Sequence, residues 1–160
     1  CPIYFDDSSN ITVSQMKAKL RRLKDVGLVI VDYLQLMSSG RRIENRVQEV
    51  SEMTRALKIM AKELNVPLIV LSQLARKTED RKDGRPQLSD LRESGSIEQD
   101  ADSVLFLVND AMATGEPERQ NIMKIVVGKN RHGETGTVEV EWSGRYTKFS
   151  SLEKRYDAPV

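Results

Sequence analysis

The chain has 160 residues, of which 39% are hydrophobic and 31% charged, and its formal net charge is +1. This length suffices for one domain with a hydrophobic core, and the composition is that of a soluble globular protein. No apolar run approaches the roughly 18 residues of a membrane span, so we expect no membrane partner. One cysteine, Cys1, excludes an internal disulfide framework and favours a reducing compartment, the cytoplasm.

The first part of the chain predicts a short strand followed by a helix. Residues 2–6 form a short apolar run whose end is marked by two acidic residues, Asp6 and Asp7, and we interpret this run as the strand. Thr12 and Gln15 have the spacing of a capping box, in which each side chain accepts a hydrogen bond from a free backbone N–H. We therefore expect a helix from Thr12 to about Asp25, with Gly27 as its stop.

The next segment predicts a strand–helix–strand unit. Residues 28–32 and 68–71 are apolar runs, the first ending in an aspartate, and such runs are typical of parallel strands buried on both faces. Between them, apolar residues recur at steps of three and four, which predicts a long amphipathic core helix after the polar loop 38–42. The helix should end at Asn65 and Pro67. Its apolar stripe consists of Ile43, Val47, Val50, Met53, Leu57, Met60 and Leu64.

The second half predicts further strands. Residues 103–108 predict a third buried strand and residues 122–128 a fourth strand. Residues 137–142 alternate polar and apolar, as in a half-exposed antiparallel strand. Residues 146–149 can pair with the last of these as a hairpin. Ser89 and Ser96 are candidate N-caps for short helices. The order of elements favours an α/β fold with a mostly parallel sheet and a C-terminal antiparallel hairpin.

Polar residues follow three of the predicted strands. Asp32 ends the first, Gln73 follows the second, and Lys129, Asn130 and Arg131 follow the fourth. Ligands of open α/β sheets bind beyond the carboxyl ends of strands, so these side chains should converge on one edge. An acid, an amide and two cations suit a magnesium-bound polyphosphate. Taken singly, each residue is better explained as a helix cap, a loop amide or a solvated charge, and the functional interpretation depends on three strand ends agreeing.

Four segments carry a resemblance to a known family. LVIVDYLQLM (28–37), PLIVLSQLAR (67–76), LSDLRESGSIEQDAD (88–102) and KNRHGETG (129–136) resemble, in order, the motifs of the DnaB-type replicative DNA helicases. The resemblance covers almost the whole chain. It implies a RecA-like P-loop NTPase core, ATP and Mg²⁺ as cofactors, and 5′-to-3′ travel on single-stranded DNA. It also implies a ring of identical subunits, a hexamer, with primase and a helicase loader as partners.

The resemblance also implies roles for single residues. Asp32 is similar to the Walker B aspartate, which holds magnesium, and Gln73 to the polar sensor of the γ-phosphate. Arg131, with Lys129 beside it, resembles an arginine finger that reaches the nucleotide of a neighbouring subunit, and such a finger contributes about 10³-fold or more in rate.

The same resemblance implies where DNA binds. Arg92, Glu93 and Gly95 match the loop that follows the DNA backbone in the central channel of the ring. The basic segment 76–85 is a second candidate for DNA contact, and a solvated loop explains it equally well because Glu79, Asp80 and Asp83 interrupt its cations.

The sequence departs from the family in one respect. It has no G-x-x-x-x-G-K-[ST] phosphate loop, and the family's catalytic glutamate is absent too. Residues 1–160 therefore correspond to a single partial motor domain, the C-terminal part of the ATPase domain without its phosphate-loop strand. We expect the chain by itself to be inactive as an ATPase.

Two other functions stay open from the sequence. The chain could belong to another RecA-like ATPase, a recombinase or a regulator. By itself it could also act as a non-catalytic DNA-binding or assembly module.

Overall fold

The computed structural model describes residues 2–74, 86–109 and 119–152, with the side chains of residues 92–94 left out. The chain divides into two compact units. The first unit comprises Cys1–Ala75 and Leu91–Ala101, and the second comprises Arg76–Asp90 and Asp102–Val160.

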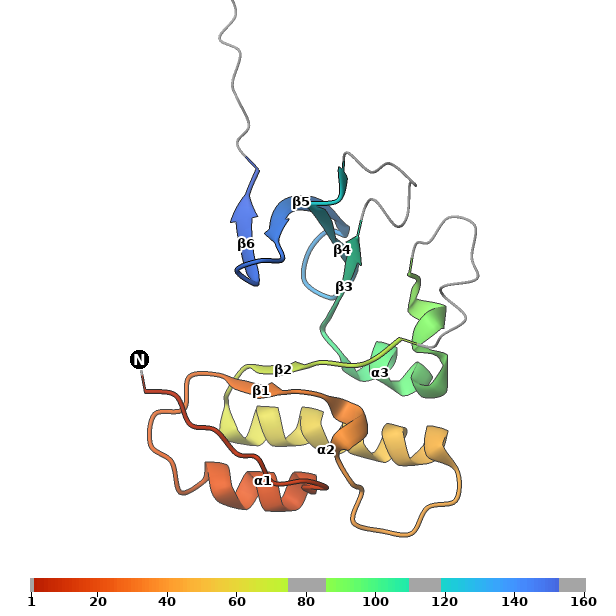
Figure 1. The fold of residues 1–160 in the computed structure, drawn as a ribbon. Coiled ribbons are helices and arrows are strands. Elements are labelled where there is room, and N and C mark those ends of the chain that lie inside the picture. The colour runs from red at the N-terminus through yellow and green to blue at the C-terminus, as the bar shows by residue number, and fades with distance from the viewer. Residues whose placement is uncertain (1, 75–85, 110–118, 153–160) are drawn as a thin grey trace, which may run out of the picture. The chain divides into compact units, whose positions relative to one another are not determined.

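The first unit contains the predicted strand–helix–strand arrangement. β1 (Val29–Val31) and β2 (Leu68–Val70) pair in parallel, and α2 (Arg46–Leu64) connects them. The short 3-10 helix η1 (Leu34–Leu36) follows β1, and α1 (Val13–Leu20) and α3 (Gly95–Asp100) complete the unit. Figure 1 shows α1 and α2 on the same side of the strand pair. The parallel pairing inferred from the two apolar runs is therefore confirmed.

The capping box at the start of α1 is confirmed. The Thr12 hydroxyl accepts a hydrogen bond from the Gln15 backbone N–H at 3.2 Å, and the Gln15 side-chain oxygen accepts one from the Thr12 N–H at 3.0 Å. The helix ends at Leu20, earlier than the predicted Asp25. Its last turn tightens, because the N–H groups of Arg22 and Leu23 bond to carbonyls three residues back rather than four.

α2 has a clear cap at each end. The Asn45 side chain accepts hydrogen bonds from the N–H groups of Val47 and Gln48, so the helix begins at Arg46, slightly later than predicted. Asn65 has the left-handed conformation, with φ of 50°, which an asparagine tolerates at a helix end. Thr54 on this helix donates a hydrogen bond to the Asp100 carboxylate on α3 at 2.8 Å.

Most of the predicted α2 stripe lies in the core of the first unit, but Val47 is 46% exposed and Ile43 precedes the helix. Four residues of the stripe are at most 4% exposed, and they pack with three residues in and after β1. The core residues are Val31, Leu34, Met37, Val50, Met53, Leu57 and Met60. The prediction that both strands are buried on both faces is wrong for this structure, because Ile30 is 60% and Ile69 50% exposed. The helices cover one face of the pair, so alternate side chains point away from them.

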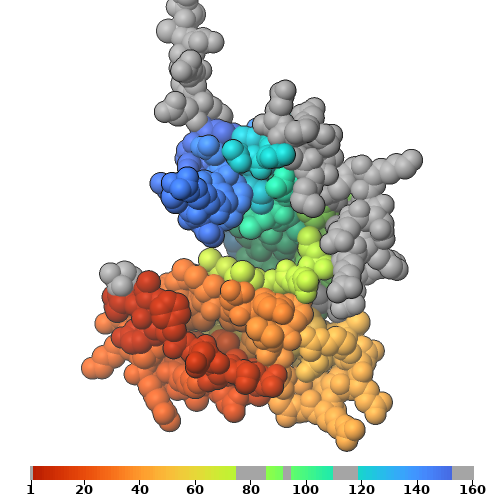
Figure 2. All heavy atoms as spheres, viewed as in Figure 1, coloured from red at the N-terminus to blue at the C-terminus, as the bar shows by residue number. Residues whose placement is uncertain are grey.

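The predicted strand at residues 2–6 is not present. Residues 2–10 are exposed and have no strand hydrogen bonds, with Phe5 92% exposed. Figure 2 shows this red segment on the outside of the unit. Asp6 instead accepts a hydrogen bond from Lys19 at 2.6 Å, and this bond, with those from Ser8, lowers the pKa of Asp6 to about 2.

The second unit is an antiparallel sheet. Its strands are β3 (Ser103–Asn109), β4 (Ile122–Asn130), β5 (Gly136–Ser143) and β6 (Lys148–Ser151), hydrogen-bonded in that order. The predicted β5–β6 hairpin is confirmed. The antiparallel part of the fold is larger than predicted, because β3 and β4 belong to it as well.

β3 is buried on one face only, which corrects the prediction of a fully buried strand. Val104, Phe106 and Val108 are buried, whereas Leu105 and Leu107 are each 59% exposed. This alternation is the usual pattern of an antiparallel strand with one covered face. Residues 104–108 are all apolar, and hydrophobicity alone does not distinguish a strand covered on one face from a strand covered on both.

The burial of α2 predicts a matched pair of stability changes. Leu57 is 3% exposed and Ile59 is 48% exposed, and both side chains have four carbons on the same helix. Leu57→Ala should lower the free energy of unfolding by about 2–5 kcal/mol, because it removes buried methyl groups and leaves a cavity. Ile59→Ala should change it by about 0.5 kcal/mol or less. Urea unfolding followed by circular dichroism measures both, and equal losses would contradict the assignment of this core.

Candidate functional site

Asp32 and Gln73 emerge at the same edge of the β1–β2 pair. The last paired residues are Val31 and Val70, and Asp32 follows Val31 directly. The pairing continues past β2, because the Leu71 N–H donates to the Val31 carbonyl at 2.9 Å. Both Asp32 and Gln73 are exposed. The structure thus brings these two predicted site residues to one edge.

Gln35 links the two strand ends and was missed by the sequence interpretation. Its amide nitrogen donates to the Ser72 hydroxyl at 3.1 Å and to the Gln73 carbonyl at 3.5 Å. Its amide oxygen accepts from the Gln73 N–H at 3.4 Å. The Gln35 side chain therefore bonds to both the N–H and the carbonyl of Gln73. The sequence feature that could have indicated Gln35 is its place in the LVIVDYLQLM segment, three residues after Asp32.

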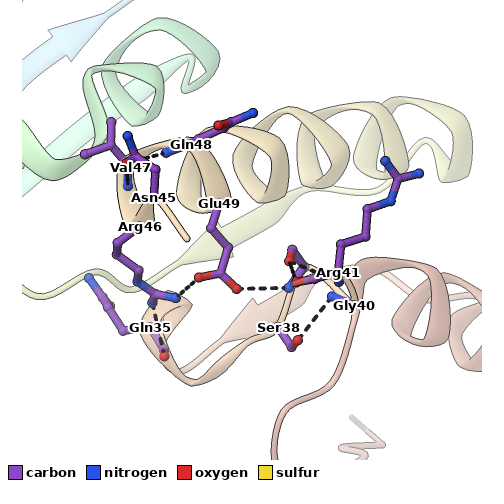
Figure 3. A network of polar contacts seen from close by, with 10 residues as sticks. Gln35, Ser38, Gly40, Arg41, Asn45, Arg46, Val47, Gln48 and Glu49 are labelled. Atoms are coloured by element: carbon purple, nitrogen blue, oxygen red, sulfur yellow. Dashed lines mark hydrogen bonds and ion pairs between the residues drawn. The ribbon is translucent and has the colours of Figure 1, made fainter. Parts of the chain in front are cut away.

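A polar network fixes the loop that carries Gln35 (Figure 3). Arg46, in the first turn of α2, donates to the Gln35 carbonyl at 3.3 Å and pairs with Glu49 at 2.6 Å. The other Glu49 oxygen accepts from the Ser39 N–H at 3.5 Å. The hydrogen bond from Arg46 is the main cause that lowers the pKa of Glu49, and the Ser39 bond adds to it. The end of β1 is thus joined to the start of α2.

Lys129 and Arg131 lie at the end of β4, directly after a bulge. Lys129 pairs with Val104 but Val127 pairs with Leu105, which leaves Gly128 as the extra residue. A Cβ atom at Gly128 would lie 2.6 Å from the Phe106 ring, so glycine is required for this approach. A bulge re-aims the side chains that follow it. The direction of Lys129 and Arg131 therefore depends on Gly128.

Arg131 is held at the surface by Asp102. Its backbone N–H donates to the Asp102 carbonyl at 2.8 Å, and its guanidinium lies 3.1 Å from the Asp102 carboxylate. The side chain of Arg131 is 43% exposed. The following turn is organised by Asn130, whose amide donates to the Glu134 carbonyl at 3.3 Å and accepts from the His132 N–H at 3.4 Å. Asp102 and the turn-forming role of Asn130 were not foreseen from the sequence.

The predicted rim that joins all of these residues stays a prediction. Asp32 and Gln73 belong to the first unit, and Lys129 and Arg131 belong to the second. Each pair is brought together within its own unit.

The segment with Arg92, Glu93 and Gly95 is helical rather than an open loop. The 3-10 helix η3 (Leu88–Ser94) leads into α3, which begins at Gly95. The side chains of Arg92 and Glu93 lie outside the description. Gly95 is exposed, and a Cβ atom there would meet no atom within 4 Å. The basic segment 76–85 lies outside the described residues.

Both predicted N-caps in this region are wrong. Ser89 lies inside η3, where the Asp90 carboxylate accepts instead from the Gln87 N–H at 2.7 Å. Ser96 is the second residue of α3, and its buried hydroxyl has no hydrogen-bond partner among the described atoms.

The described residues hold no preformed cluster of metal-binding side chains. Across 2–74, 86–109 and 119–152, no group of three or more His, Cys, Asp or Glu side chains could hold a metal ion by itself. In the same part of the chain, no helix is long and apolar enough to cross a bilayer. A pocket of about 260 Å³ lies between α1, the Ser39–Arg41 loop and α2, and neither Asp32 nor Gln73 lines it.

Comparisons with known proteins agree with this architecture. The family model for the DnaB-like helicase C terminal domain matches residues 1–151. The replicative DNA helicase DnaB of Geobacillus stearothermophilus is 52% identical over 159 residues, covering 97% of this chain and 35% of that protein. The replicative DNA helicase DnaB of Leifsonia xyli is 54% identical over 154 residues, covering 94% of this chain and 34% of that protein. The chain thus spans about a third of these relatives' length.

Two solved structures have the same fold. The ATPase domain of G40P superposes with a TM-score of 0.84 at 42% identity, covering 89% of this chain and 52% of that chain. A DnaB-like replicative helicase, studied with its interactions with primase, superposes with a TM-score of 0.87 at 41% identity, covering 92% and 37%. These folds are RecA-like ATPase domains, as the sequence motifs implied. The chain belongs to the DnaB-like helicase C-terminal domain family.

Proposed function

We propose that the chain forms part of the ATP-driven motor of a replicative DNA helicase. The observation that carries the proposal is the common edge of β1 and β2, from which Asp32 and Gln73 both emerge. Family membership supports it. The chain has no G-x-x-x-x-G-K-[ST] loop, so ATP hydrolysis needs a segment that supplies one, and the motor is a longer polypeptide than these residues.

Asp32 is proposed as the carboxylate that holds Mg²⁺ with ATP. Mg²⁺ in nucleotide sites keeps several waters and uses only one or two carboxylates besides the phosphates. A single exposed carboxylate at a strand end suits this donor set, and a ready-made cluster of acids is not needed. Bound Mg²⁺ neutralises charge on the phosphates during phosphoryl transfer. Asp32 orients the ion, directly or through water.

Gln73 is proposed as the sensor of the γ-phosphate. Its amide has a donor and an acceptor, so it can bond to a phosphate oxygen or to the attacking water. Gln73 follows β2, which pairs with the strand that precedes Asp32, and this common edge supports a role at the same triphosphate. Loss of the γ-phosphate removes a partner of this amide, and the backbone after β2 can respond.

Arg131 is proposed as an arginine finger that acts on a neighbouring copy of the chain, with Lys129 assisting. Its partial exposure and its place after the bulge allow it to reach outward. The Asp102 carboxylate holds the guanidinium in place until phosphate oxygens compete for it. A finger supplied in trans requires an adjoining subunit, and we propose that the subunits are identical and form a closed ring, a hexamer.

The proposed substrate is duplex DNA, opened while the ring moves along one strand. Arg92, Glu93 and Gly95 lie in η3 and at the start of α3, and they are the proposed contact with the DNA backbone. Backbone contact suits an aromatic content of 5%, which is low for a base-stacking surface. Primase and a helicase loader are the proposed partners, and the cytoplasm the proposed location.

The finger assignment predicts a loss that a neighbouring subunit can restore. In the full-length helicase that contains this chain, Arg131→Ala should reduce ATP hydrolysis about 10³-fold while ATP binding persists. Arg145→Ala is the matched control, because Arg145 is exposed between β5 and β6, 5.6 Å from the Tyr146 ring. Turnover near the parent rate in Arg131→Ala would overturn the assignment.

Mixed rings separate action in trans from action in cis. Rings of Arg131→Ala subunits and Asp32→Asn subunits contain some interfaces with both residues intact. If the finger acts in trans, such mixtures should regain hydrolysis that neither variant has alone. No recovery at any mixing ratio would mean that both residues serve the same subunit's nucleotide.

The magnesium assignment predicts a metal-dependent defect. Asp32→Asn should reduce hydrolysis at least about 10²-fold, because it removes the charge that orients the ion. Activity should also need more Mg²⁺ for its half-maximal value. Asp25→Asn is the control, since Asp25 is exposed and its φ of 56° is tolerated by asparagine. An unchanged Mg²⁺ titration in Asp32→Asn would contradict the role.

A further inference from the structure

The amide of Gln35 occupies the space between the two strand ends. It donates to the Ser72 hydroxyl and to the Gln73 carbonyl, and it accepts from the Gln73 N–H. No aliphatic side chain of the same length could do this, because the contact needs a donor and an acceptor on one planar group. Residues 71–74 form no helix or strand, and the Gln35 side chain ties the backbone of Gln73 to η1, which follows β1.

The position of Gln35 is itself fixed from two sides. Leu34, the preceding residue in η1, is 1% exposed in the core, and its N–H donates to the Leu71 carbonyl at 2.9 Å. Arg46 holds the Gln35 carbonyl at 3.3 Å while paired with Glu49 (Figure 3). A side chain with such an anchored backbone is preorganised, so its amide contacts cost little conformational entropy.

We propose that Gln35 is a positioning residue for Gln73, holding its backbone so that the Gln73 amide is aimed at the γ-phosphate. The proposal rests on the sensor role given to Gln73 above. Gln35 does not touch the phosphates in this account and acts only through Gln73. Arg46 contributes indirectly to the position of Gln73, because its guanidinium holds the Gln35 carbonyl.

A positioning role for Gln35 and a merely structural role predict different changes in kcat and in stability. A displacement of about 1 Å in a reacting group can cost about 10²-fold in rate. Loss of the Gln35 amide should therefore lower kcat for DNA-stimulated ATP hydrolysis. It should leave KM for ATP nearly unchanged, because the phosphate loop and the metal still bind the nucleotide. A merely structural role would instead lower thermal stability or ring assembly.

The test is a double-mutant cycle in the full-length helicase that contains this chain. Gln35→Met keeps the length of the side chain and removes its hydrogen bonds. We expect kcat to fall about 10- to 100-fold, KM to stay within about twofold, and the melting temperature of the ring to be unchanged. Gln48→Met is the matched control, because Gln48 is an exposed glutamine in the first turn of α2. It should behave like the parent.

The cycle is completed by Gln73→Ala and by the double variant. If Gln35 acts through Gln73, the double variant should be no slower than Gln73→Ala alone, because the positioned group is already gone. Losses that multiply would show that Gln35 acts independently, and the proposal would be overturned. It would equally be overturned by a normal kcat in Gln35→Met.

Failure of the sensor role can be told apart from failure of this inference. A normal kcat in Gln73→Ala would remove the sensor role, and the positioning proposal with it. A slow Gln73→Ala beside a normal Gln35→Met would remove only the positioning proposal. If Gln35→Met does not assemble, Ser72→Ala tests the same link by deleting one hydroxyl. It should lower kcat several-fold alone and not at all in the Gln73→Ala background, and additive losses there would contradict the proposal.

Discussion

The parallel pairing of β1 with β2 is the interaction on which the site depends. It brings the carboxyl ends of two strands to one edge, and thereby places Asp32 beside the segment that carries Gln73. The pairing persists because α2 connects the strands and buries its apolar stripe against one face of the pair. Burial of each such side chain contributes roughly 1.5–3 kcal/mol, so the core of the first unit also fixes the geometry of its polar edge.

Much of the fold could be predicted because it follows from local rules. The capping box of Thr12 and Gln15, the stripe of α2 and its end at Asn65 depend on residues close in sequence. The errors concern properties set by distant partners. Residues 2–5 are apolar but pair with no strand in the described part of the chain. Ile30 and Leu105 are exposed because, within each described unit, only one face of their strand is covered. Hydrophobicity alone cannot report how many faces are covered.

The candidate site also combines residues that local sequence predicts with residues that only long-range contacts reveal. The common edge of Asp32 and Gln73 could be predicted because strand ends can be read from sequence, and ligands of such sheets gather there. Gln35, Asp102 and the turn-forming role of Asn130 could not be inferred, since each acts through contacts that only the folded chain creates. All three residues lie inside the helicase-like segments 28–37, 88–102 and 129–136. The family resemblance therefore marked their positions, but it did not show which contacts they make.

The central claim is that Asp32 and Gln73 serve one triphosphate. The most direct measurement is a structure of the full-length helicase that contains this chain, with Mg²⁺ and a non-hydrolysable ATP analogue bound. The account predicts Mg²⁺ bound by Asp32, directly or through water, and the Gln73 amide within hydrogen-bond distance of the γ-phosphate or of the water beside it. A triphosphate bound away from the shared edge of β1 and β2 would contradict it.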